Sequence, residues 1–286
     1  MSEKPEWIRR RIPPSQLLEK IRILINDLNL HTICENALCP NIGLCFERGI
    51  ATFLIMGDVC TRNCKFCAVK KGTPLPLDKN EPEKIAIAIK RLNLSHVVIT
   101  SVTRDDLPDF GASHFVNTVN KIREINKNTT IELLIPDFQG NTEYLDRIIN
   151  CRPEIINHNI EMVPRLYSII RPNSNFERSL RILKYLKENT NNQYIKTGMM
   201  IGLGETDKEI FKTIEILAKT GCDILTIGQY LRPSKNQVEV VKYYRPEFFK
   251  ELKNYGLSLG FKYVYSDVFV RSSFNAKEVF DSIKKS

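Results

Sequence analysis

Short apolar runs alternate with amphipathic segments along most of the chain, which predicts strands connected by helices. Apolar runs of strand length occupy residues 53–56, 97–100, 131–135, 154–157, 194–201 and 224–228. Between them, apolar residues recur at helical spacing, as at Ile85, Ile89 and Leu92. Strands that alternate with helices form a parallel sheet with right-handed crossovers. Six such units are too few for an eight-stranded barrel, so we expect an α/β fold in the form of a partial (β/α)6 barrel.

The same pattern divides the chain into three parts. Residues 1–50 form an N-terminal extension, in which an amphipathic helix begins after Ser15, a suitable N-cap. Residues 51–260 form the barrel. Residues 261–286 form a C-terminal extension that opens with a strand-like run.

Two pairs of residues predict the starts of barrel helices. Ser174 with Glu177 and Thr206 with Glu209 have the spacing of a capping box. In this motif the hydroxyl and the carboxylate satisfy backbone N–H groups that the first helical turn leaves unpaired. We therefore expect a helix to start at each pair.

Three closely spaced cysteines follow the first predicted strand. Cys60, Cys64 and Cys67 are separated by three and then two residues, so their thiolates can face one metal centre. A 4Fe–4S cluster normally takes four cysteine ligands, so three ligands leave one iron open, and open sites do chemistry. The alternative is half of a zinc site, but no second C-x2-C pair follows. The loop lies at the carboxyl end of a strand, where parallel sheets gather their active sites.

A second set of three cysteines precedes the barrel. Cys34, Cys39 and Cys45 are separated by four and then five residues in a loop-like segment. A zinc-binding or redox-inert loop is the alternative to a second cluster. In a reducing compartment, eight cysteines point to metal rather than disulfides. Cys151 and Cys222 match no cluster spacing, and we expect them to pack among apolar side chains.

Composition narrows the class of protein. Hydrophobic residues make up 42% of the 286 residues, and no apolar run approaches about 18 residues, so no membrane span is expected. The N-terminus mixes charges and lacks the apolar core of a signal peptide, which favours a cytoplasmic protein. The net charge is +9, but the basic residues are scattered. This pattern argues against a nucleic-acid partner. A general composition bias, seen in the abundance of Lys, Asn and Ile, explains the charge, and a basic surface for acidic protein partners is the functional alternative.

The first cysteine set, with Phe66 before its last member, resembles the signature of radical S-adenosylmethionine (SAM) enzymes. The segment 198–205 resembles their GxIxGxxE motif, with Met200 at the isoleucine position. The resemblance implies a barrel of the radical SAM type with N- and C-terminal extensions. It also implies that a cluster on the first set binds and cleaves SAM.

The two cysteine sets together resemble the lipoyl synthase family. Further matches occur at residues 4–7, 100–107, 157–159, 163–165, 228–233 and 271–274. The last match reads Arg271-Ser-Ser-Phe274, where the family has RSSY. The phenylalanine removes one hydroxyl and leaves both serines in place.

The resemblance implies insertion of two sulfur atoms, at carbons 6 and 8 of an octanoyl chain carried on a lysine. A second 4Fe–4S cluster, on Cys34, Cys39 and Cys45 with Ser273 as its fourth ligand, would donate the sulfur. The implied carriers are lipoyl domains of 2-oxoacid dehydrogenases and the glycine-cleavage H protein. The implied electron source is a reduced flavodoxin or ferredoxin.

SAM presents an amino group, a carboxylate and a ribose, so polar residues at the strand ends are candidate partners. These candidates are Thr103, Asp105, Asn159, Glu161, Arg165, Arg171, Gly202 and Glu205. Arg165 or Arg171 is suited to pair with the SAM carboxylate, and Gly202 lets a ligand approach the backbone closely. Each could instead be a capping or solvated loop residue.

Two other functions are compatible with these residues. One is a radical SAM enzyme of another kind, whose auxiliary cluster serves a free small molecule. The other is a zinc protein that binds RNA, which predicts stoichiometric zinc and no acid-labile sulfide. The chain lacks the interleaved aromatic and basic residues that RNA-binding sheets use.

Overall fold

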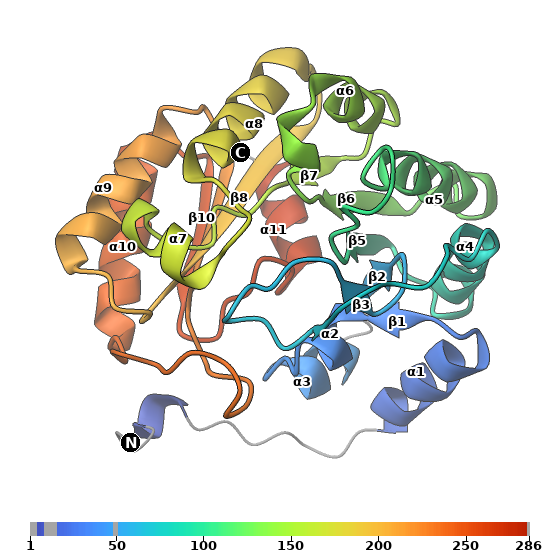
Figure 1. Cartoon of the computed structure of the whole chain (residues 1–286), viewed down its shortest axis with the longest axis horizontal. Coiled ribbons are helices and arrows are strands. Elements are labelled where there is room, and N and C mark those ends of the chain that lie inside the picture. The colour runs from blue at the N-terminus through green and yellow to red at the C-terminus, as the bar shows by residue number, and fades with distance from the viewer. Residues whose placement is uncertain (1–4, 9–15, 48–50, 285–286) are drawn as a thin grey trace.

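The computed structural model describes residues 5–8, 16–47 and 51–284, and its centre is an eight-stranded sheet (Figure 1). In spatial order the strands are β1 (His31–Thr32), β2 (Thr52–Ile55), β5 (His96–Ser101), β6 (Thr130–Leu134), β7 (Ile155–Asn157), β8 (Tyr194–Ile201), β9 (Ile224–Gln229) and β10 (Tyr263–Asp267). Neighbours are parallel, except that β1 is antiparallel to β2. The partial barrel is therefore confirmed. β10 adds a seventh parallel strand to the predicted six.

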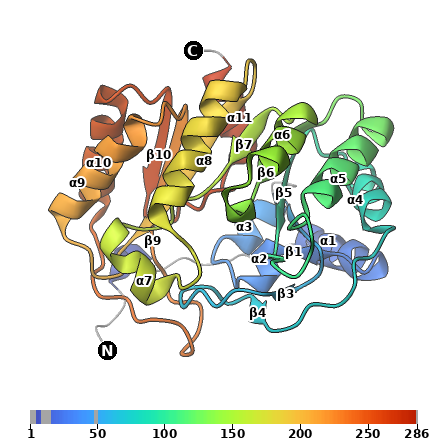
Figure 2. The same ribbon diagram turned by 45° about the horizontal axis from the view of Figure 1, so that its top comes forward.

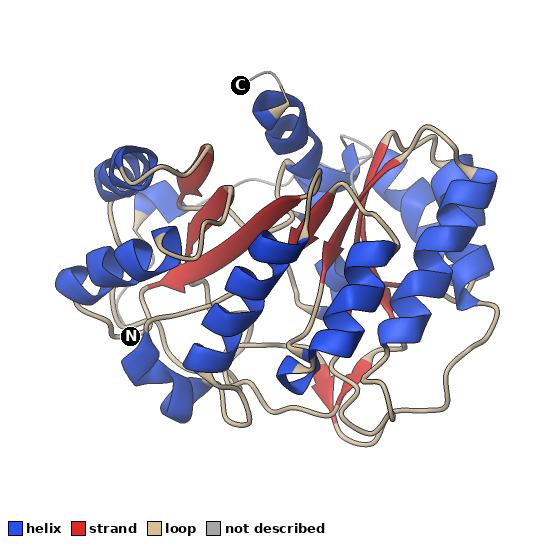
Figure 3. Ribbon diagram, turned by 90° about the horizontal axis from the view of Figure 1, so that it is seen from above, coloured by secondary structure: helices blue, strands red, loops and turns tan. Residues whose placement is uncertain are grey.

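Helices cover the outer face of the curved sheet (Figures 1 and 3). The barrel helices are α4 (Glu81–Arg91), α5 (Ala112–Ile125), α6 (Thr142–Asn150), η3 (Pro164–Leu166), α7 (Tyr167–Ile170), α8 (Phe176–Asn189), α9 (Asp207–Ala218) and α10 (Pro246–Ser258), with η2 (Phe138–Gly140) after β6. Their apolar sides face the strands, as the fully buried Phe115, Val119 and Ile122 of α5 show. In the described part of the chain, no helix is long and apolar enough to cross a membrane.

The two predicted capping boxes have different outcomes. Thr206 and Glu209 cap α9 reciprocally, as predicted. The prediction at Ser174 is wrong, because Asn175 is the N-cap of α8 and accepts the backbone N–H of Arg178 at 2.8 Å. An Asn side chain caps as well as a hydroxyl does, and it moves the helix start by one residue. α1 (Gln16–Asp27) begins directly after Ser15, which lies outside the described residues.

The N-terminal extension joins the barrel at one edge of the sheet. Its 3-10 helix η1 (Glu6–Ile8) and α1 precede β1, which pairs with β2 and places Thr32 opposite Phe53. Thr32 also caps α2 (Ile33–Asn36) by accepting the backbone N–H of Glu35 at 3.4 Å. The segment that we expected to be a loop thus contains α2 and α3 (Ile42–Glu47), which hold two of its cysteines.

The C-terminal extension ends in a helix that the sequence analysis did not predict, α11 (Ala276–Ile283). Val279, Phe280 and Ile283 pack against Ile155 and Ile224, the first residues of β7 and β9. In Figure 1, α11 lies in the middle of the ring of strands. It therefore covers the amino ends of the strands, opposite the end that carries the cysteine loop.

Candidate functional site

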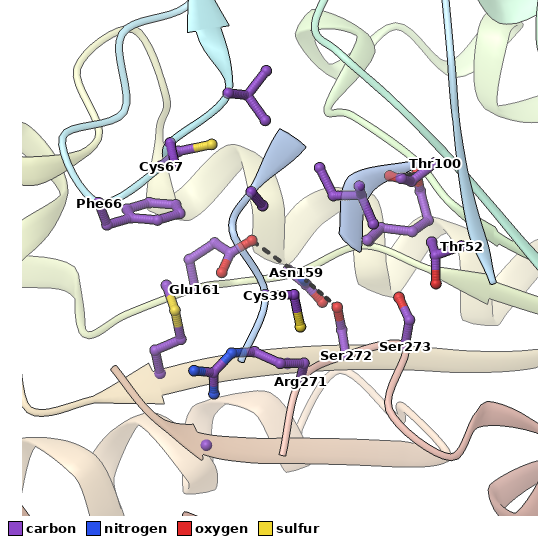
Figure 4. Close-up of a pocket in the computed structure, with 18 of the residues that line it drawn as sticks. Cys39, Thr52, Phe66, Cys67, Thr100, Asn159, Glu161, Arg271, Ser272 and Ser273 are labelled. Atoms are coloured by element: carbon purple, nitrogen blue, oxygen red, sulfur yellow. Dashed lines mark hydrogen bonds between the residues drawn. The ribbon is translucent and has the colours of Figure 1, made fainter. Parts of the chain in front are cut away.

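A cavity of about 330 Å³ opens at the carboxyl ends of the strands. Both cysteine sets line it, the members being Cys34, Cys39, Cys45, Cys60, Cys64 and Cys67. Figure 4 shows one member of each set, Cys39 and Cys67. The N-terminal extension and the barrel loop are separate in sequence, and the pairing of β1 with β2 brings them to the same space. Both cysteine sets therefore face the same cavity.

The donor set fits iron–sulfur clusters. No three His, Cys, Asp or Glu side chains of the described residues converge on a single metal-ion position, whereas each thiolate of a cluster binds a different iron. The Cys60 sulfur accepts the backbone N–H groups of Arg62 and Thr103, each at 3.4 Å. Burial raises the pKa of Cys64, and it raises the pKa of Cys67 to about 12. A bound metal overcomes that cost because it deprotonates a coordinating thiol.

The loop that carries the first cysteine set is anchored by a buried arginine. Arg62, only 4% exposed, donates two hydrogen bonds to Asp105 at 2.7 and 2.8 Å and two to Asp137 at 2.7 and 2.9 Å. Arg178 of α8 pairs with Asp137 as well, at 2.8 Å. Since Asp105 follows β5 and Asp137 follows β6, Arg62 ties three strand ends together. The sequence analysis missed this residue.

Four of the predicted SAM partners line the cavity: Thr103, Asn159, Glu161 and Arg171. The Asn159 Oδ1 and the Arg171 Nε are buried and have no hydrogen-bond partner among the described residues. Buried polar atoms normally have partners, so this pair fits a polar ligand. Glu161 adopts a positive φ of 69°, which is rare for a residue other than glycine and clusters at functional sites.

Two other predicted SAM partners have protein partners instead. Asp105 does not line the cavity and is engaged by Arg62. The Arg165 side chain is 52% exposed, pairs with Glu209 at 2.7 Å and donates to the Gly204 carbonyl at 2.8 Å. Of the two arginines considered for the SAM carboxylate, Arg171 is the one that faces the cavity.

Gly202 and Glu205 shape the loop after β8 and lie outside the cavity lining. Glu205 accepts the backbone N–H groups of Gly202 and of Leu203. Gly202 has a φ of +108°, and a Cβ there would stand 2.5 Å from the Lys242 carbonyl oxygen. Glycine is needed here for the turn and for close packing.

The C-terminal segment crosses the cavity and carries Ser272 and Ser273 into it (Figure 4). Ser272 accepts a hydrogen bond from Asn159 at 3.2 Å, whereas Ser273 has no hydrogen bond to another described residue. The segment lies directly on β9, because a Cβ on Gly228 would stand 2.0 Å from the Val270 carbonyl oxygen. Arg271 lines the cavity too, although the motif analysis gave it no role.

The fold and the cavity define a radical SAM protein. The family model of the Radical SAM superfamily matches residues 54–217. The solved structure of methylornithine synthase (PylB) has the same fold, with a TM-score of 0.54 and 14% identity over 96% of this chain and 94% of that one.

Relatives with closer sequences specify the family. A lipoyl synthase from Caldicellulosiruptor saccharolyticus is 52% identical over 277 residues, which cover 97% of each chain. One from Caldanaerobacter subterraneus is 50% identical over 273 residues, 96% of this chain and 95% of the relative. The chain belongs to the lipoyl synthase family and is a radical SAM sulfurtransferase. SAM and 4Fe–4S clusters are its cofactors.

Proposed function

We propose that the protein inserts sulfur at carbons 6 and 8 of an octanoyl chain held on a lysine of a lipoyl domain. The observation that carries this proposal is the convergence of both cysteine sets on one cavity. Hydrogen abstraction and sulfur delivery must act on the same carbon atom, so their sources have to face a common space.

The two cysteine sets have separate roles in this proposal. Cys60, Cys64 and Cys67 hold the cluster that binds SAM, and Cys34, Cys39 and Cys45 hold the second cluster with Ser273. When bound, the first cluster and SAM supply the radical that removes a hydrogen atom, and the second cluster supplies sulfur. Ser273 suits the fourth position because it faces the cavity and makes no hydrogen bond to another residue that the structure describes.

The polar lining orients SAM. The Arg171 guanidinium pairs with the carboxylate of SAM, for which its Nε has no competing partner among the described residues. The Asn159 Oδ1 accepts from the amino group or the ribose, while its amide nitrogen donates to Glu161 at 3.1 Å and to Ser272 at 3.2 Å. Asn159 thereby links the SAM side of the cavity to the C-terminal segment.

The apolar lining suits the acyl chain. Ile33, Leu54, Phe66, Val69 and Leu134 all contribute to the wall. Each methylene group transferred from water to such a wall contributes about 0.8 kcal/mol. The same side chains exclude water, which protects a reactive carbon centre from side reactions.

The carriers are lipoyl domains of 2-oxoacid dehydrogenases and the glycine-cleavage H protein, and the electron donor is a reduced flavodoxin or ferredoxin. We propose the cytoplasm as the site of the reaction. The net charge of +9 favours acidic partners of this kind.

The proposal is tested with two triple variants, assayed without oxygen on an octanoyl-lysine peptide by mass spectrometry. Replacing Cys60, Cys64 and Cys67 by alanine should remove about half of the iron and abolish SAM cleavage, since one of the two four-iron clusters loses all of its cysteine ligands. Replacing the other three cysteines should preserve deoxyadenosine formation and abolish sulfur insertion. Lipoyl product from the second variant would contradict the sulfur-donor role, and a protein that contains only zinc would contradict both cluster assignments.

A further inference from the structure

Ile169 and Val241 are among the large apolar side chains that are exposed at the cavity end of the barrel. Ile169 of α7 is 53% exposed, and Val241, between β9 and α10, is 68% exposed. Figure 2 shows α7, β4 (Lys70–Lys71) and the loop between β9 and α10 along the same lower edge of the molecule. Exposed apolar side chains that share one face of a soluble protein are typical of interaction sites.

The backbone connects these loops into one surface around the cysteine loop. The Lys65 N–H donates to the Ile170 carbonyl at 2.8 Å, and the Lys65 carbonyl accepts the Val238 N–H at 3.0 Å. The cysteine loop, with β3 (Val59–Cys60) at its start, is therefore held between α7 and the segment that leads to Val241. We call Lys65, Ile169, Lys235 and Val241 the entrance patch.

The entrance patch borders the cavity and carries unpaired positive charge. Lys65 is adjacent to Phe66, and Lys235 is two residues from Pro233, and both Phe66 and Pro233 line the cavity. Lys65 and Lys235 are exposed and form no ion pair with a described residue. By contrast, the nearby Lys242 is neutralised by Asp207 at 2.8 Å.

We propose that the entrance patch docks the lipoyl domain through an acidic surface of that domain, an inference that rests on the function proposed above. A folded domain cannot enter a cavity of about 330 Å³, so only its acylated lysine goes in. The short tether requires the domain body to sit at the cavity edge. Apolar contacts with Ile169 and Val241 and attraction to Lys65 and Lys235 give a small, transient interface of the kind that turnover needs.

The test compares one reaction on two substrates, an octanoylated lipoyl domain and an octanoyl-lysine peptide, with dithionite as reductant. Lys235→Glu and Val241→Glu should each lower kcat/KM for the domain by about tenfold. The first variant repels an acidic partner, and the second places a charge in an apolar contact, so both should slow association. Turnover of the peptide should stay within about twofold of wild type. Lys253→Glu is the matched control, because Lys253 is exposed on α10, away from the cavity.

The ionic-strength dependence adds a readout that misfolding does not imitate. The KM of the unmodified enzyme for the domain should rise with salt, and Lys235→Glu should flatten this dependence. Equal activity of all variants on the domain would overturn the proposal, as would equal loss on both substrates or an equal effect of Lys253→Glu. If the variants lose activity only when a protein electron donor replaces dithionite, the surface belongs to that donor and the proposal is overturned too. Failure of the unmodified enzyme on the peptide would instead refute the proposed function.

Discussion

Arg62 offers the sharpest test of how the fold supports the cysteine loop. Burial alone would raise the pKa of Asp137, but the hydrogen bonds and the charge of Arg62 outweigh it and hold that pKa well below its ordinary value. Removing one member of a buried ion pair costs about 3–5 kcal/mol, because the other charge stays buried without its partner. In Arg62→Ala, Asp137 retains its ion pair with Arg178 at 2.8 Å. We therefore expect the free energy of unfolding to fall by an amount at the lower end of this range, about 3 kcal/mol.

The more conservative change separates charge from geometry. In Arg62→Lys the charge remains, but an ammonium group cannot bind two carboxylates through parallel hydrogen-bond pairs as a guanidinium does. We expect a loss of about 2 kcal/mol, close to one hydrogen bond to a charged group. Arg123→Ala is the control, because the Arg123 side chain is 36% exposed and pairs with Glu154 at 3.3 Å. Surface pairs of this kind contribute less than about 1 kcal/mol.

The assay has two parts. Urea unfolding of the metal-free chain gives the change in the free energy of unfolding, provided that the m-value is unchanged. Iron and acid-labile sulfide per chain after reconstitution report the first cluster, and in Arg62→Ala we expect both to fall to about half because only that cluster is affected. If Arg62→Ala lowers the free energy of unfolding by less than about 1 kcal/mol and keeps its full iron content, Arg62 does not hold the loop.

Four further predictions concern the cavity and the barrel. Gly228→Ala places a Cβ 2.0 Å from the Val270 carbonyl oxygen, so it should displace the serine segment, lower stability by about 1–3 kcal/mol and stop sulfur insertion while SAM cleavage continues. Arg171→Lys should weaken SAM binding in equilibrium titration because the forked contact is lost, and unchanged affinity would exclude this role. Ser273→Cys should keep the second cluster but slow sulfur release, since thiolate suits iron better than a hydroxyl does, whereas Ser272→Ala should be milder in the same assay. Burial lowers the pKa of His96 to about 4 in the folded protein. As the pH falls, His96 is therefore protonated in the unfolded chain before it is protonated in the folded one. Stability should therefore fall by up to about 3 kcal/mol as the pH drops from about 6.5 to 4, and a His96 variant that retains the whole slope in urea unfolding would disprove this.

The local sequence determined the elements of the barrel. The strand at 194–201 and the capping box at Thr206 follow from hydrophobic periodicity and helix-end chemistry, which act over a few residues. The spacing of Cys60, Cys64 and Cys67 likewise predicted that these side chains face one space, because residues a few positions apart on a short loop stay close wherever the loop lies, and all three line the cavity. Even α11 has a helical pattern in the sequence, because the apolar residues Val279, Phe280 and Ile283 recur at helical spacing.

The tertiary structure decided which side chains share the cavity. Asp105 and Thr103 follow the same strand, yet Asp105 turns to Arg62 and Thr103 faces the cavity. The choice depends on an arginine 43 positions away in the chain, and no local pattern encodes such a partner. The same holds for the meeting of the two cysteine sets, which depends on β1 pairing with β2, and for Ser273, which reaches the cavity because Gly228 leaves room for its segment. Spacing specifies the chemistry that a segment can perform, whereas the contacts between distant segments determine where that chemistry takes place.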